Sequence, residues 1–180
     1  MLELSLHVLD VLQNSVEAGA TRVKLEVNED LAGDRLEITV EDNGRGMDPE
    51  MTARVFDPFV TTRKTRHIGL GIPLFAEAAR GCNGDLKIES TPGVGTRLTA
   101  GFQHSHLDRM PLGDMPSVIL MTLLSPRNVD IEYVHRIDRQ EFAFDSAEAR
   151  EVLGEVPFSQ PEVRAWLEST LREGEAEIKK

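Results

Sequence analysis

Apolar residues recur at helical spacing at the start of the chain and at every second position in the two segments that follow. Residues 2–18 carry them three and four positions apart, which predicts a helix with one apolar stripe. Gly19 suits a left-handed cap at the end of that helix. Residues 22–28 and 36–41 alternate between apolar and polar positions, as half-buried strands do. With a turn at residues 31–34 between them they predict a hairpin, whose second strand ends at Asp42.

The next stretch predicts two helices and a second hairpin. Asp48 and Pro49 are residue types that favour the N-cap and the first position of a helix, so a short helix should begin there. A second helix is expected at residues 72–80, with its apolar side chains on one side. Residues 85–90 and 95–102 read as two strands around a turn that contains proline and glycine.

The pattern divides the chain into a first unit at residues 1–104, a linker at 105–113 and a small α+β appendage at 114–180. Pro111 and Gly113 mark the linker. The elements expected in the appendage are a helix at 115–124, strands at 128–137 and 140–144, and helices at 146–153 and 160–173. The apolar residues of 118–121 would also suit a strand, so that alternative stays open.

Helix caps and the chain end give further detail in the appendage. Asp114 has the chemistry of an N-cap. Asp145 with Glu148, and Ser159 with Glu162, have the spacing of capping boxes. The last six residues are mostly charged, and we expect them to be frayed. None of these features indicates a chemical role for the appendage.

Composition excludes several classes of protein. The formal net charge is −11, which argues against nonspecific nucleic-acid binding, because neutralising phosphates requires a basic surface. The chain lacks both an apolar run of about 20 residues and the layout of a signal peptide, so we expect a cytoplasmic protein without a membrane partner. Cys82 is the single cysteine, which rules out an internal disulfide and suits a reducing compartment.

A glycine-rich turn at residues 42–47, with the sequence DNGRGM, follows the second strand. Gly44 and Gly46 leave the backbone open to close approach by a flat or anionic ligand. Asp42 is the acid in this turn and could accept a hydrogen bond from an exocyclic amine. Alone, this motif favours an ordinary hairpin turn.

Three more stretches change that interpretation, at residues 10–20, 69–72 and 93–96, with Phe56-Asp57-Pro58-Phe59 between them. In this order they resemble the ATP-binding superfamily of gyrase, the heat-shock chaperone, histidine kinases and MutL, from about Leu2 to Phe102. The resemblance implies the Bergerat fold, a two-layer α/β sandwich with a mixed, mostly antiparallel sheet and helices on one face. It also implies ATP and Mg²⁺ as ligands.

The resemblance assigns roles to individual residues. Asn14 falls at the family's magnesium-binding asparagine, and Asp10 falls where gyrase-like and MutL-like members carry the glutamate that activates water. Asp42 and Thr96 fall at the positions that hold adenine together with a water molecule. The other nucleotide contacts implied are Gly44, Gly46 and Met47 of the first glycine motif and Gly69, Leu70 and Gly71 of the second, with Lys64 or Arg63 on the phosphates.

Residues 60–68 are polar and basic in an otherwise acidic chain, and we interpret them as a lid over the triphosphate. Phe56 and Phe59 beside it are expected to be core aromatics, with a role in lid hinging as the alternative. His104 and His106 could face one way on a strand, but no further ligand completes a metal site, and we interpret them as linker residues.

Two functions remain open at the level of sequence. The first is an enzyme that hydrolyses ATP or transfers its γ-phosphate to a partner protein, as anti-sigma kinases do. The second is a non-catalytic, nucleotide-gated module whose appendage reports the bound state to a partner. Asp10 favours the first. Only thirteen residues precede Asn14, so we do not expect an autophosphorylating histidine kinase of the usual build, and His7 is expected to pack or lie on the polar side of its helix. The pattern does not indicate an oligomeric state.

Overall fold

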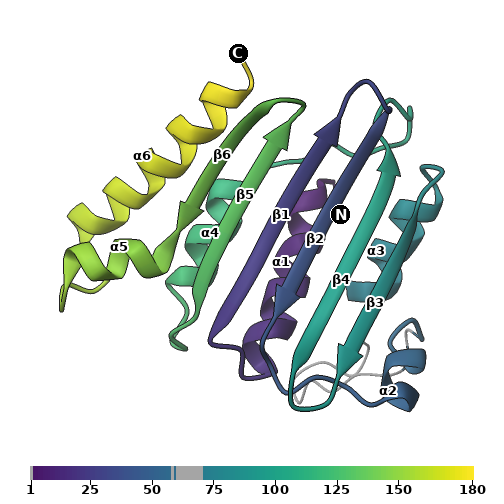
Figure 1. The fold of residues 1–180 in the computed structure, drawn as a ribbon, viewed down its shortest axis with the longest axis horizontal. Coiled ribbons are helices and arrows are strands. Elements are labelled where there is room, and N and C mark those ends of the chain that lie inside the picture. The colour runs from purple at the N-terminus through teal and green to yellow at the C-terminus, as the bar shows by residue number, and fades with distance from the viewer. Residues whose placement is uncertain (1, 58, 60–70) are drawn as a thin grey trace.

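Six strands of the described chain form one mixed sheet in the computed structural model, which describes residues 2–57, 59 and 71–180 (Figure 1). Their order is β3-β4-β2-β1-β5-β6, and neighbours are antiparallel except β1 and β5, which are parallel. The expected mixed, mostly antiparallel sheet is therefore confirmed. The strands are β1 (Arg22–Asp30), β2 (Arg35–Asp42), β3 (Asp85–Thr91), β4 (Gly95–Gln103), β5 (Asp130–Ile137) and β6 (Gln140–Asp145).

The helices form the second layer of this α+β fold. In Figure 1, α1, α3 and α4 lie behind the sheet, α6 lies beside β6, and α2 lies at the end of the edge strand β3. This arrangement confirms the expected two-layer class with helices on one face. The helices are α1 (Leu4–Glu17), α2 (Pro49–Arg54), α3 (Gly71–Arg80), α4 (Met115–Leu123), α5 (Ser146–Leu153) and α6 (Pro161–Ile178).

Alternation along the strands places the core between the two layers. Val23, Leu25 and Val27 of β1 are fully buried toward the helices, whereas the residues between them are partly exposed on the other face. His7 of α1 is buried and its ring stacks on Phe75 of α3, with 5.0 Å between ring centroids. The packing role predicted for His7 is thereby confirmed, and burial lowers the pKa of its imidazole.

Most of the predicted helix starts carry the expected caps. The side chain of Asp48 accepts a hydrogen bond from the Met51 N–H, and Asp145 accepts one from the Ala147 N–H. Asp114 accepts one from the Ser117 N–H at 3.0 Å, so residues 115–123 are a helix and the strand alternative is wrong. Gly19 has φ +77°, as a left-handed position after α1 requires.

Two predictions about α6 are wrong. Pro161 takes the first helical position, which proline favours, so Gln160 and not Ser159 is the N-cap residue, and its side chain makes no cap. The helix also continues to Ile178, whose buried side chain anchors the end that we expected to be frayed. The 18 residues of α6 carry many charges. Among the described residues, no helix is long and apolar enough to cross a membrane.

The C-terminal segment continues the sheet of the first unit. β5 pairs with β1 along its length, from Arg22 opposite Asp130 to Glu29 opposite Ile137. Between the two parts, residues 105–113 pack against the start of α1, where the N–H groups of Leu4 and Ser5 donate to the carbonyls of Pro111 and Leu112. These contacts satisfy two donors that a helix N-terminus would otherwise leave unpaired. The division into two units joined by a linker stays a prediction, and the two parts share one sheet.

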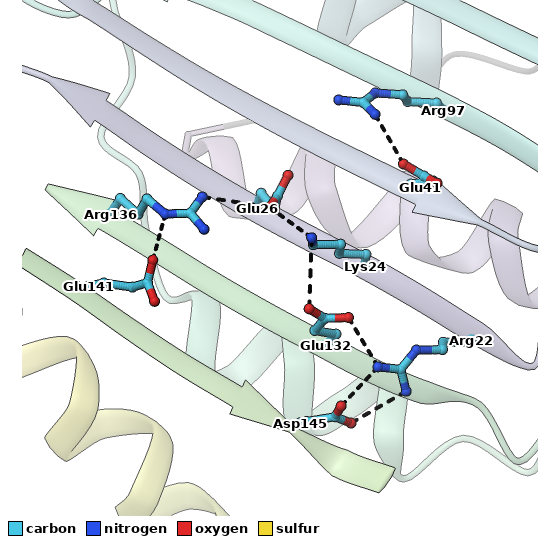
Figure 2. A network of polar contacts seen from close by, with 9 residues as sticks. All are labelled: Arg22, Lys24, Glu26, Glu41, Arg97, Glu132, Arg136, Glu141 and Asp145. Atoms are coloured by element: carbon cyan, nitrogen blue, oxygen red, sulfur yellow. Dashed lines mark hydrogen bonds and ion pairs between the residues drawn. The ribbon is translucent and has the colours of Figure 1, made fainter. Parts of the chain in front are cut away.

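Charged side chains of both signs form ion pairs on the sheet face that the helices do not cover (Figure 2). Arg22 of β1 reaches Glu132 of β5 at 3.0 Å and Asp145 of β6 at 2.8 Å. Lys24 lies 3.1 Å from Glu26 and 3.8 Å from Glu132. The polar positions of the strand pattern therefore form a cross-strand charge network, in which opposite charges on adjacent strands favour this register.

Glu132→Gln should destabilise the fold by less than about 1 kcal/mol, because both partners of Glu132 are partly exposed and screened by solvent. Urea unfolding at low salt and in 1 M NaCl would measure the loss, which should shrink at high salt. Glu155→Gln, on an exposed residue outside this network, is the matched control and should change stability equally at both salt concentrations. A large, salt-independent loss in Glu132→Gln would contradict this view of the open face.

Candidate functional site

The glycine turn after β2 is tied to two neighbouring elements by its backbone. The Arg45 N–H donates to the carbonyl of Ala18 just after α1, and the Arg45 carbonyl accepts from the Gly93 N–H in the β3–β4 turn. Asn43 adds a side-chain clamp, since its Oδ1 accepts from the N–H groups of Thr21 and Arg22. The turn is thus held between the end of α1 and the tip of the β3–β4 hairpin.

Gly46 is required by this close approach. Its φ is +70°, and a Cβ at this position would lie 2.0 Å from the Thr91 carbonyl oxygen. The next residue, Met47, is half-buried and donates its N–H to the Ser90 hydroxyl at 2.8 Å. Gly44 is buried beside Ala18, where a Cβ would lie 2.9 Å from the alanine Cβ. Both glycines therefore fit the turn closely onto its neighbours.

The Asp42 carboxylate is held by two donors. Its Oδ1 accepts from the Gly44 N–H at 2.9 Å, and its Oδ2 accepts from the Ser15 hydroxyl at 2.6 Å. Ser15 is a residue that the sequence reasoning missed. The available signal was its place on the buried side of the first helix, because a buried hydroxyl requires a hydrogen-bond partner.

Asp42 and Thr96 lie directly opposite each other on β2 and β4. Thr96 in turn lies opposite Ser90 of β3, and the two hydroxyl oxygens are 2.8 Å apart. Residues paired in this way point to the same face, here the face covered by helices. The structure therefore brings together two of the residues that the resemblance assigned to the adenine position, and adds Ser90 to them.

Asp10 and Asn14 lie one turn apart on α1. Asp10 is buried and lies against the first residue of α3, where a Cβ on Gly71 would be 3.3 Å from the Asp10 Cβ and 3.4 Å from its Oδ2. Asn14 is half-buried. The acid thus lies against the N-terminus of α3, and the amide lies one helical turn further along α1, a setting that suits phosphate.

Several predicted site residues lie outside the described residues. They are Lys64, Gly69 and Leu70, together with Arg63 and the rest of the lid segment at 60–68. Of the two aromatics before it, Phe56 packs against the core, and the Arg80 guanidinium lies 5.8 Å from its ring centroid. Phe59 is 82% exposed, so its assignment to the core is wrong. Its N–H donates to Asp57 Oδ1, a local turn that keeps this residue on the surface.

Within the described residues, no group of three or more histidine, cysteine, aspartate or glutamate side chains is placed to hold a metal. The oxygen donors of Asp10 and Asn14 nevertheless have the chemistry of a Mg²⁺ site completed by substrate phosphates. His104 takes another role, since its Nε2 lies 2.7 Å from Glu29 Oε2 on β1 and fixes the chain after β4. Nδ1 of His106 accepts from the Asp108 N–H within the linker.

Comparison with known proteins identifies the family. Residues 2–106 match the model of the family described as histidine kinase-, DNA gyrase B-, and HSP90-like ATPase. The chain is 36% identical over 93 residues to the signal transduction histidine-protein kinase AtoS of Escherichia coli, and 40% identical over 92 residues to the sensor protein kinase FleS of Pseudomonas aeruginosa. Each match covers 51% of this chain but only 15% of AtoS and 23% of FleS.

A solved structure, the N-terminal domain of a DNA repair protein, shares the fold with a TM-score of 0.58. At 13% identity it covers 79% of this chain and 52% of that one, so the likeness reaches beyond the residues of the family match. More than half of the chain matches the family, and three of the motifs that carry the resemblance, residues 10–20, 42–47 and 93–96, lie together at the site. The chain belongs to the histidine kinase-, DNA gyrase B- and HSP90-like ATPase family.

Proposed function

We propose that this protein binds ATP with Mg²⁺ and either hydrolyses it or transfers its γ-phosphate to a partner protein. The observation that carries the proposal is the Asp42 carboxylate, fixed by Ser15 and the Gly44 N–H and lying opposite Thr96. A carboxylate with fixed geometry is a strong acceptor for the exocyclic amine of adenine. Membership of the ATPase family gives independent support.

The phosphates would lie toward α1 and α3. The N-terminus of α3 at Gly71 would offer the positive end of the helix dipole and its backbone N–H groups to an anion. Asn14 would hold Mg²⁺, which supplies positive charge to the phosphates when bound. Lys64 from the predicted lid would add a cation. These assignments leave Asp10, one turn before Asn14, facing the end of the triphosphate.

Asp10 would then act as the general base. As the oxygen of a water molecule or an acceptor hydroxyl attacks the γ-phosphorus, its proton passes to an Asp10 carboxylate oxygen, and the bond to the β-phosphate oxygen breaks to release ADP. Aspartate is one methylene shorter than the glutamate of gyrase-like members. Asp10 packs closely on Gly71. We infer that this contact with the backbone of α3 holds the carboxylate near the phosphates and makes up for the shorter side chain.

A nucleotide-gated module without turnover is the second candidate, favoured by one contact. Arg127, in the segment that leads into β5, donates from Nη1 to the Val16 carbonyl at the end of α1 at 2.9 Å. A movement of α1 on nucleotide binding would therefore reach the C-terminal segment directly. In this case the segment would present the bound state to a protein partner.

Incubation with γ-labelled ATP and Mg²⁺, with and without cell extract, distinguishes these functions. Free labelled phosphate indicates hydrolysis, and label on a second protein indicates phosphotransfer. Nucleotide binding with neither product indicates the gated module. Absence of ATP binding in the presence of Mg²⁺ would contradict the proposal as a whole.

Asp42→Asn should abolish the stabilisation that ATP gives. At 100 times its Kd, a ligand that binds only the native state adds about 2.7 kcal/mol to the free energy of unfolding. The neutral amide lacks the charged acceptor for the adenine amine, so this gain should disappear. Thermal unfolding with and without ATP and Mg²⁺ measures it. Glu41→Gln is the matched control, because Glu41 is the preceding residue but pairs with Arg97 on the open face (Figure 2). An unchanged shift in Asp42→Asn would remove Asp42 from the site.

A further inference from the structure

Ser90 of β3 is the common partner of three polar groups at the base-binding end of the site. Its hydroxyl oxygen accepts from the Met47 N–H at 2.8 Å and lies 3.1 Å from the Gly95 carbonyl oxygen, to which it donates. It also lies 2.8 Å from the Thr96 hydroxyl oxygen. Ser90 therefore joins the glycine turn after β2 to the start of β4.

The number of protons decides the direction of these bonds. A serine hydroxyl has one proton to donate and two lone pairs that accept. The Gly95 carbonyl can only accept, so it takes the Ser90 proton. The Met47 N–H fills one lone pair. All three contacts are hydrogen bonds only if Thr96 donates its own proton to the remaining lone pair of Ser90.

Thr96 consequently offers lone pairs, and not a proton, to a ligand. Across the ladder, the Asp42 carboxylate is also an acceptor, with its two oxygens already oriented by Ser15 and Gly44. The two groups together form an edge that favours a base carrying an N–H donor. A purine with a carbonyl oxygen in place of the amino group would bring a hydrogen-bond acceptor against Thr96 and Asp42, which are acceptors too. A site built for hydrogen bonding rejects such a ligand strongly.

We propose that Ser90 is a positioning residue that directs the Thr96 hydroxyl and thereby sets the preference of the site for 6-amino over 6-oxo purine nucleotides. This inference rests on the proposed function, because it concerns the base of the bound nucleotide. The other reading of Ser90 is that it only holds the glycine turn in place. That reading predicts an equal loss of affinity for every nucleotide, whatever its base.

The test compares the dissociation constants of ATP and of inosine triphosphate, which carries a 6-oxo group, by calorimetry with Mg²⁺. Wild type should bind ATP more tightly. In Ser90→Ala the Thr96 proton is free to rotate toward the ligand. The ratio of the dissociation constant of inosine triphosphate to that of ATP should therefore fall by about threefold to tenfold, the range of one neutral hydrogen bond. Ser90→Thr keeps the hydroxyl in a strand position that favours β-branched residues and should restore the ratio.

Thr99→Val is the control, because Thr99 lies on the same strand as Thr96 but pairs with Lys87 and Thr39 on the open face. It should leave the ratio unchanged. If Ser90→Ala does not fold, as judged by circular dichroism, Ser90→Cys nearly keeps the volume with a much weaker acceptor for the Thr96 proton and should lower the ratio in the same direction.

Equal weakening of both nucleotides in Ser90→Ala, or failure of Ser90→Thr to restore the ratio, would overturn the role of Ser90. Wild type that binds ATP without any preference over inosine triphosphate would overturn the inference and leave the proposed function standing. Wild type that binds neither nucleotide would overturn both.

Discussion

Asp10→Asn should lower phosphate release or transfer from ATP by about 10²–10⁴-fold, the usual contribution of a positioned general base, and leave ATP affinity nearly unchanged. The substitution keeps the size of the side chain and the α1 helix. It removes only the capacity to take a proton. Because a base acts mainly in the transition state, the loss should appear in kcat rather than in the binding constant. Steady-state phosphate release, with ATP affinity measured separately, gives both quantities.

Asn14→Ala provides the contrast. A metal ligand acts in the ground state as well, so this variant should weaken Mg²⁺-dependent binding of ATP itself. Glu77→Gln on the exposed side of α3 is a control that should alter neither quantity. If wild type neither releases nor transfers phosphate, while Asp10→Asn binds ATP as wild type does, the enzyme hypothesis fails and the nucleotide-gated module is the better account.

The helices and strands of residues 1–104 could be predicted well because apolar residues recur every three to four positions in the helices and every second position in the strands. The stripe of α1 and the alternation of β1 and β2 are local patterns, and each strand face follows from them directly. The pairing of Asp42 with Thr96 came from family resemblance. Strand alternation assigns a residue to a face but does not assign its neighbour on the next strand. Ser90 was missed for this reason, since it is an ordinary strand residue until the register places it beside Thr96. Ser15 lies on α1, where the helix pattern places it on the buried side but does not name Asp42 as its partner.

The C-terminal segment shows the same limit at a larger scale. Its helices and strands were expected, but the parallel pairing of β5 with β1 depends on contacts far apart in the chain. Glu175 lies in a charged helix that reads as a solvated surface, yet it is 5% exposed because its partners come from the sheet. Phe59 shows the reverse error, since its aromatic character alone suggested burial.

Glu175 belongs to a buried polar cluster that joins α6 to the sheet. The fully buried His135 of β5 contacts Glu175 through Nδ1 and Glu29 of β1 through Nε2, both at 2.8 Å. The other polar groups that face the cluster are the Tyr133 hydroxyl and Lys179 on Glu175 and His104 on Glu29. An imidazolium between two carboxylates thus connects β1, β5 and α6.

His135→Ala should destabilise the fold by about 3–5 kcal/mol, because it leaves the buried Glu175 and the half-buried Glu29 without their shared cation. His106→Ala is the matched control. His106 lies in the linker and makes one local hydrogen bond, so its loss should be about 1 kcal/mol or less. Urea unfolding near pH 6 would compare them. A loss in His135→Ala as small as that in His106→Ala would mean that His135 is neutral or weakly coupled to its carboxylates.

The contribution of the same cluster to the free energy of unfolding should pass through a maximum as the pH is varied. Burial raises the pKa of Glu29, but hydrogen bonds from His135 and His104 outweigh it and lower that pKa from 4.5 to about 2. Stability from Glu29 is therefore complete above about pH 4.5 and lost as the pH falls toward 2, at most about 3 kcal/mol. For His135, burial lowers the pKa, but the bonds and charges of Glu175 and Glu29 raise it above 6.5.

Stability from the His135 imidazolium is present below pH 6.5 and should be lost as the pH rises through its higher pKa in the folded protein. The contribution of this cluster to the wild-type free energy of unfolding should thus peak between about pH 4.5 and 6.5 and decline on both sides. In His135→Ala the decline on the alkaline side should be absent, since the group that releases the proton is gone. Urea unfolding from pH 3 to 9 tests this. An alkaline decline of equal size in both proteins would assign it to another group and separate His135 from the pH dependence.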